Sequence, residues 1–112
     1  MYIAFLLRFG FEKEEIMIKY IVVSEEATIA IKYDPKKREL VIGGYKRFIS
    51  VMEWIIEQAL GRVAPRPHWT QKNKVRYIFR VSKFEKVKGM IEKLREEGVT
   101  VVEVTNLERI MR

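Results

Sequence analysis

The chain contains no cysteine, and this absence removes several kinds of chemistry. Disulfide bonds, thiolate nucleophiles and thiolate zinc sites are all excluded, so stability must come from packing and charge. Histidine is scarce too, since His68 is the only one. One histidine cannot build a multi-histidine metal site within one chain. The sequence therefore predicts no catalytic residue, no metal ion and no cofactor, and it favours a binding protein over an enzyme, with His68 as a general base as the alternative.

Long apolar runs are also missing. No stretch of about 18 uncharged apolar residues occurs, which predicts no membrane span. The start, MYIAFLLRFGF, has neither a basic leader nor a small-residue cleavage site, so it is not typical of a signal peptide. We therefore expect an intracellular, cytoplasmic protein. Its 112 residues suit a single domain over residues 1–112, and its many Ile, Val, Lys and Glu residues are typical of thermophile proteins.

A further shortage, that of acidic residues, is local. Between Glu57 and Glu85 there are seven Lys and Arg residues and no Asp or Glu, whereas the whole chain has 22 basic and 15 acidic residues. This window therefore carries the entire formal excess of +7. Such a surplus favours an anionic partner, and nucleic acid is the commonest one inside a cell. The alternative is an ordinary solvated surface.

The pattern of residues 61–82 predicts a basic β-hairpin that turns at residues 71–73. Side chains on a strand alternate between its two faces. The second strand would bury Val75, Tyr77, Phe79 and Val81. It would expose a cationic face made of Lys74, Arg76, Ile78 and Arg80. The first strand would add a second row, made of Arg62, Ala64, Arg66, His68 and Thr70, and pairing would join the two rows.

Pro65 and Pro67 restrict the first strand, because each proline fixes a φ angle and lacks an amide donor. This part would be either a stiff arm that presents Arg66 to a partner or an edge that resists aggregation. Trp69 would either stack on an unpaired base or lie in the core. As a binding surface, the stretch predicts nine nucleic-acid contacts: Arg62, Arg66, His68, Trp69, Lys72, Lys74, Arg76, Arg80 and Lys83.

Two helices are predicted from apolar residues at helical spacing. They cover residues 45–60 and 84–97, and Gly61 and Gly98 would end them. Ser82 and Glu85 match a capping box at the start of the second helix. These helices would pack on one face of a mixed or antiparallel sheet, which makes the fold class α+β.

The remaining strands are predicted from β-branched content and turn signals. A hairpin joins residues 27–33 and 39–42, after which Gly43 and Gly44 would break the extended chain. Residues 16–23 and 99–104 are further strands, although 16–23 also has a helical stripe. Residues 2–9 suit a buried strand or a short buried helix, and residues 105–108 would form a terminal turn.

The order of hairpin, helix, basic hairpin and second helix over about residues 39–97 resembles one half of a LAGLIDADG-type homing endonuclease domain. The resemblance lies mainly in WIIEQALGRVAPRPHWTQKNKVRYIFRVSKFEKVKGMIEKL. It implies a basic sheet face that binds the major groove of DNA, and pairing of two such halves. The family motif ends in a metal-binding acid, whereas the nearest segment here, residues 2–10, has Arg8 and no acid. Without this acid, the resemblance implies a descendant of the family that binds DNA and does not cleave it.

Three functions are therefore compared. The first is non-enzymatic nucleic-acid binding, with duplex DNA favoured over RNA. The second is a metal-dependent nuclease related to the LAGLIDADG family. The third is an assembly protein in which residues 2–9 pair with another chain, as in a homodimer, and the basic face meets an acidic protein. No membrane partner is expected, because no segment combines a basic face with a broad apolar face free for insertion.

Overall fold

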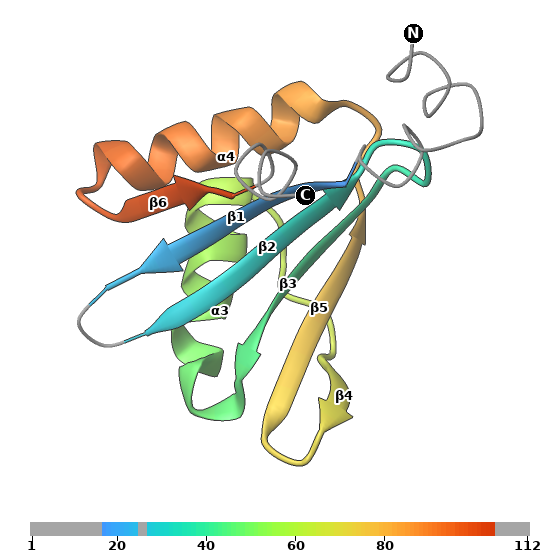
Figure 1. Cartoon of the computed structure of the whole chain (residues 1–112), viewed down its shortest axis with the longest axis vertical. Helices are drawn as coiled ribbons and strands as arrows, with labels where there is room; N and C mark the ends of the chain where they lie inside the picture. The colour runs from blue at the N-terminus through green and yellow to red at the C-terminus, as the bar shows by residue number, and fades with distance from the viewer. Residues whose placement is uncertain (1–16, 25–26, 105–112) are drawn as a thin grey trace, which may run out of the picture.

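The fold is a single antiparallel sheet covered by helices on one side. The structure, a computed structural model, describes residues 17–24 and 27–104. Neighbouring strands are antiparallel throughout, in the order β4-β5-β3-β2-β1-β6. The strands are β1 (Ile18–Val23), β2 (Thr28–Asp34), β3 (Glu39–Tyr45), β4 (His68–Gln71), β5 (Lys74–Arg80) and β6 (Thr100–Glu103). Figure 1 shows them fanning out with the sheet's twist. The α+β prediction is confirmed.

The first helical segment follows β3 and changes its winding along its length. It consists of a 3-10 turn, η1 (Lys46–Phe48), an α-helical part, α3 (Ile49–Trp54), and a π-helical part, η2 (Ile55–Leu60). Gly61 ends it with φ 76°, a left-handed conformation that favours glycine. The predicted helix is confirmed except at Tyr45, which belongs to β3.

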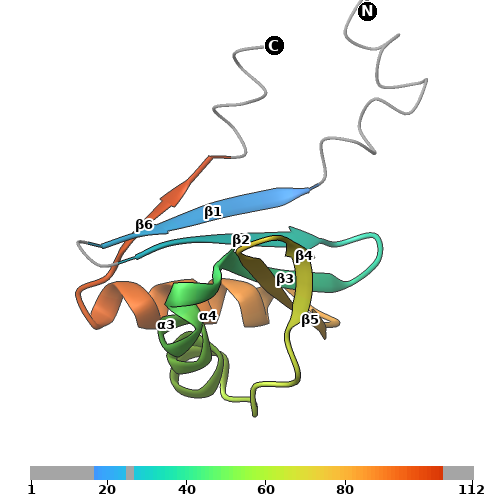
Figure 2. The same cartoon turned by 90° about the horizontal axis from the view of Figure 1, so that it is seen from below.

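The second helix, α4 (Phe84–Glu96), is also confirmed, and Gly98 follows it with φ 86°. The predicted capping box is wrong. Lys83 takes the N-cap position and no side chain caps the helix, because Ser82 lies one residue too early to reach the free amides. In Figure 2 both helical segments lie on the same side of the sheet, and no described element covers the other side.

The core fills the space between the sheet and the helices. Along β2 and β5 every second residue is buried, as the alternation of strand faces requires. The largest side chains with almost no exposed surface are Tyr33, Tyr77, Ile29, Ile31, Leu40, Ile42, Met52, Ile55, Ile56, Met90, Leu94 and Val22. Tyr33 donates a buried hydrogen bond from its hydroxyl to the Val81 carbonyl oxygen at 2.6 Å. Its ring stacks on Phe84 with centroids 5.8 Å apart, which ties the start of α4 to the sheet.

Gly43 and Gly44 do not break the extended chain, so that prediction is wrong. Both lie within β3, where Gly43 pairs with Arg76 and Gly44 pairs with Val75. A Cβ atom on Gly43 would lie 3.2 Å from the Val75 carbonyl oxygen, and one on Gly44 would lie 3.3 Å from the Thr28 carbonyl oxygen. The two glycines therefore allow neighbouring strands to approach, and they leave one stretch of the sheet without side chains.

The other strand predictions agree with the structure where it describes the chain. The hairpin of β2 and β3 is confirmed, and the Asp34 carboxylate accepts hydrogen bonds from the Lys36 and Lys37 amides at 2.9 and 3.2 Å in its turn. Residues 18–23 form β1, and residues 100–103 form β6. Residues 2–9 and 105–108 lie outside the described residues. No helix in the described part of the chain is long and apolar enough to cross a membrane.

Candidate functional site

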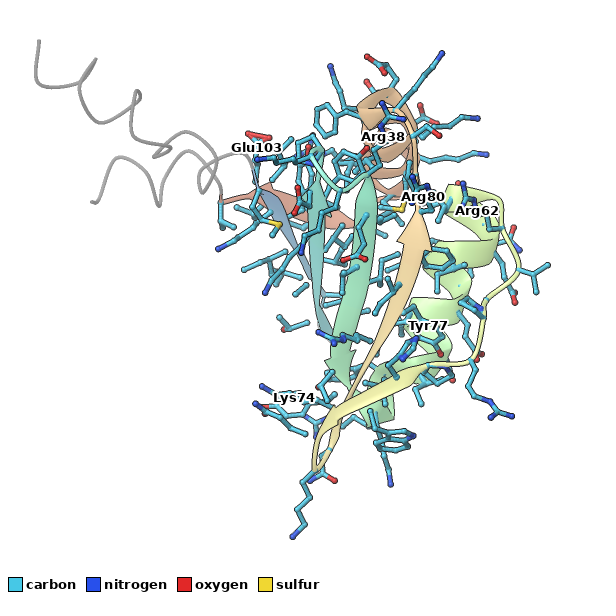
Figure 3. All side chains as sticks on the ribbon, turned by 90° about the vertical axis from the view of Figure 1, so that its right-hand side faces the viewer. Arg38, Arg62, Lys74, Tyr77, Arg80 and Glu103 are labelled. Carbon is cyan, nitrogen blue, oxygen red and sulfur yellow. The ribbon has the colours of Figure 1, made fainter. Side chains whose placement is uncertain are left out.

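The face of the sheet opposite the helices, called the open face below, carries the predicted cationic strand. Strand β5 is the clearest part of it. Its core-facing residues Val75, Tyr77 and Phe79 are at most 7 % exposed. The intervening Arg76 and Arg80 are exposed and Lys74 is half-buried, as alternation predicts. Figure 3 shows Lys74 and Arg80 at opposite ends of β5. Six residues of extended chain correspond to a separation of about 20 Å.

The second cationic row, predicted on the preceding strand, is wrong in most of its length. Residues 62–67 are not a strand, and β4 contains only His68–Gln71. Gly61 turns the chain away from helical geometry, and Pro65 and Pro67 lack the amide donors that a ladder needs. The two arginines of this stretch are therefore not aligned opposite β5.

Those two arginines take different places. The Arg62 guanidinium lies near Arg80 at one end of β5, where its Nη1 donates a hydrogen bond to the Arg80 carbonyl oxygen at 2.9 Å (Figure 3). It also lies 6.0 Å from the centre of the Phe79 ring. Arg66 is exposed in the loop that leads to β4. Arg62 thus lies at the end of β5 beside the core-facing Phe79 ring, and Arg66 has no described position on the open face.

Of the other predicted nucleic-acid contacts, three lie in the β4–β5 hairpin and one lies past the end of β5. His68 is exposed and pairs with Arg76 across the β4–β5 ladder. Trp69 pairs with Val75 but is 60 % exposed, so its alternative placement in the core is wrong. Lys72 is exposed in the β-turn. Lys83 is exposed at the start of α4, past the end of β5.

Sequence reasoning missed a group of cations at the other end of β5. Lys46 and Arg47 fall within the helix predicted over residues 45–60, and they lie at the corner where β3 meets η1. The Lys46 amide donates to the Asn73 carbonyl oxygen at 2.8 Å, which joins this corner to the tip of the hairpin. Lys46 Nζ lies 5.7 Å from the centre of the Trp69 ring. No local pattern signals this contact, because it joins residues far apart in the chain.

The same corner has a second pairing of cations with an aromatic ring. Lys74 Nζ lies 5.3 Å from the centre of the Tyr45 ring, and the Arg47 guanidinium carbon lies 5.7 Å from it. Tyr45 is 47 % exposed. Cations at these distances are attracted to the ring faces and are held near the surface by them. The ring contacts therefore concentrate positive charge at the hairpin end of the sheet, where Tyr45 and Lys74 belong to the open face.

A concave trough of about 390 Å³ is hollowed into the open face. Its cationic lining comes from Lys32, Lys37, Lys74 and Arg76. Its acidic lining comes from Asp34 and Glu39, so the trough is net positive. The remaining lining residues are Met17, Ala30, Val41, Gly43, Gly44, Thr70 and Val75. The sequence did not reveal Lys32 and Lys37 as part of the site, because the β3–β5 pairing that brings the β2–β3 hairpin beside the basic strand joins segments far apart in the chain.

Two tyrosines on the covered side of the sheet, Tyr20 and Tyr77, have raised pKa values. Burial raises the pKa of Tyr77, and the nearby Glu53 carboxylate raises it further. Burial likewise raises the pKa of Tyr20, with Glu103 adding to the effect and Arg95 opposing it. Within residues 17–24 and 27–104, no three His, Asp or Glu side chains are grouped so that they could hold a metal ion.

Comparisons with known protein families, curated proteins and solved structures found no similar protein. No protein-family model matches the chain, and no curated protein or solved structure matches it either.

Proposed function

We propose that this intracellular protein binds nucleic acid without cleaving it, with duplex DNA as the preferred ligand. The observation that supports the proposal most strongly is the placement of Lys74, Arg76 and Arg80 on the open face of one strand. Within the described part of the chain no acidic side chain forms an ion pair with any of the three. None of the three is therefore neutralised by an ion pair with a described residue, and the nearest acid in the ladder is Glu39, which lies opposite Arg80.

The dimensions of this row suit a polyanion. A duplex carries about one phosphate charge per 1.7 Å of its axis, so a row of about 20 Å meets more phosphates than it has cations. Lys72, in the turn at one end of β5, extends the row beyond the strand. Contacts of this kind fix the position of the duplex and carry no sequence information by themselves.

A charge reversal with a matched control tests the proposal. The double variant Arg76→Glu and Arg80→Glu changes the net charge by the same amount as Lys86→Glu and Lys88→Glu, which lies on exposed positions of α4. We expect the first variant to bind a fluorescent duplex about 100-fold more weakly in an anisotropy titration, which corresponds to about 1.4 kcal/mol per reversal. The affinity of the α4 variant for the duplex should fall much less. Equal losses in both variants would show that only the overall charge matters.

The kinship with homing endonucleases remains a prediction, and the nuclease it implies has a simple test. Plasmid DNA incubated with the protein and Mg²⁺ or Mn²⁺ would be nicked or linearised by a nuclease. The binding proposal expects intact plasmid at every metal concentration. Cleavage that EDTA abolishes would replace the binding proposal with the nuclease.

Self-association is favoured by a different feature, the outer edge of β6. Among the described strands β6 pairs only with β1, and Val23 and Val102 beside this edge are 44 % and 45 % exposed. An open strand edge with apolar neighbours is suited to pairing with another chain. Light scattering after nuclease treatment would give a dimer mass if this edge joins two copies, and a monomer mass if it does not.

A further inference from the structure

The floor of the trough is the place on the open face with the smallest side chains. Ala30 of β2 pairs directly with Gly43 of β3, and Gly43 pairs in turn with Arg76 of β5. The positions on either side of Ala30 along the same face of β2 are Thr28 and Lys32, which are both larger. The sheet backbone is therefore approachable at Ala30 and Gly43, where a flat group can lie close to it.

The walls of the trough offer both signs of charge. Lys74 and Arg76 line the β5 side, and Thr70 of β4 lines it as well. Glu39 lines the trough from the start of β3. Asp34 also lines it, but one of its carboxylate oxygens already accepts two backbone amides in the β2–β3 turn. The trough thus combines a small floor, an acceptor carboxylate at one end and phosphate-binding cations along β5.

An unpaired nucleotide matches this combination. Its flat base can lie on the floor at Ala30 and Gly43. Its phosphate can meet Lys74 or Arg76. The half-exposed Tyr45 ring follows Gly43 along the same face of β3 and can stack on the next base.

A base within an intact duplex cannot make these contacts. Its pairing edge is occupied by the partner strand and its faces by neighbouring bases, so it would first have to leave the stack at a cost of a few kcal/mol. The backbone of a duplex, in contrast, needs only the outer cations. We propose that the trough takes one unpaired base of a single strand, so that the protein binds single-stranded segments by a contact that a duplex lacks. This inference rests on the proposed nucleic-acid binding.

Filling the trough tests it, and the same strand offers a matched control. Ala30 and Thr28 are both exposed, lie on the same face of β2 and are two residues apart, but only Ala30 lines the trough. Ala30→Leu would fill the floor, whereas Thr28→Leu adds a similar side chain outside it. Both variants are titrated with a labelled oligo(dC) single strand and with a duplex of oligo(dC) and oligo(dG), by anisotropy at one salt concentration.

We expect Ala30→Leu to weaken binding of the single strand about 10-fold and to change duplex binding less than about 2-fold. Thr28→Leu should change neither by more than about 2-fold. An unchanged single-strand affinity in Ala30→Leu, or an equal loss in Thr28→Leu, would overturn the inference. If Ala30→Leu does not show the wild-type urea transition, Ala30→Ile and Thr28→Ile replace the pair, since β-branched residues suit a strand.

The two proposals fail in different ways. If the wild-type protein binds neither ligand, both the proposed function and the trough site are wrong. If it binds both ligands with wild-type affinity retained in Ala30→Leu, the nucleic-acid function stands and only the trough site is wrong.

Discussion

The two faces of the sheet differ in what their residues do, although they alternate along the same strands. On the covered face, Leu40, Ile42 and Tyr77 have no exposed surface and face the helices. On the open face, Val41 is half-buried and Arg76 is exposed. The covered face therefore carries most of the folding free energy. The open face is free to carry charge that contributes little to stability.

The largest expected effect on the free energy of unfolding is the difference between substitutions at Leu40 and Val41, which are neighbours in β3 but lie on opposite faces of the sheet. Leu40→Ala should lower the free energy of unfolding by about 2–5 kcal/mol, because it leaves a cavity in the core. Val41→Ala, one residue further along β3, should lower it by less than about 1 kcal/mol. Urea denaturation of both variants measures the difference. Similar losses would mean that the open face is packed as well as the core.

A smaller effect is expected from the buried hydroxyl of Tyr33. Tyr33→Phe removes the 2.6 Å hydrogen bond to the Val81 carbonyl oxygen and leaves that oxygen without its donor, which should cost about 1–3 kcal/mol. Tyr45→Phe is the control on the open face and should cost less than about 0.5 kcal/mol. Urea denaturation measures the free energy of unfolding of both variants. Equal losses of this free energy would contradict the assignment of the two tyrosines to different environments.

The pH dependence of stability should also come from the covered face. The pKa values of Tyr20 and Tyr77 are raised above the ordinary value of 10.0, so the folded state holds these protons more tightly than the unfolded state. This contribution to stability is complete below pH 10 and is lost as pH rises above it. Tyr77→Phe should therefore make the urea midpoint less sensitive to pH in this range. A stability curve identical to that of the wild type would contradict this.

The smallest effect on stability is expected at Trp69. Because its side chain is 60 % exposed, Trp69→Phe should change the free energy of unfolding by less than about 0.5 kcal/mol. Trp54→Phe, at a side chain that is 37 % exposed and borders the helix pair, is the comparison and should cost more. If Trp69→Phe were the more destabilising of the two, Trp69 would have a packing role that its exposure does not suggest.

Local patterns were sufficient to predict the elements whose residues alternate regularly. The two faces of β5 follow from apolar and polar residues that alternate at every second position, and both helices follow from apolar residues three and four positions apart. The β-hairpin at Asp34 follows from its turn residues. These features depend on neighbours in the chain, so the sequence alone contains them.

Features that depend on distant residues could not be predicted in the same way. Gly43 and Gly44 looked like a chain break, because only the pairing of β3 with β2 and β5 shows why a side chain would not fit there. Arg62 looked like part of a strand, although it instead reaches the end of β5. The trough likewise needs the antiparallel order of β2, β3 and β5, which joins segments that are far apart in sequence.

The most direct test of the open face is the salt dependence of duplex binding. For each phosphate that a cation neutralises, the slope of log affinity against log salt concentration falls by about 0.9. The wild-type protein should show a steep negative slope, and Arg76→Glu with Arg80→Glu should make it shallower by about 2, whereas Lys86→Glu with Lys88→Glu should leave it nearly unchanged. A wild-type slope near zero, or equal slopes in all three proteins, would contradict binding through this face.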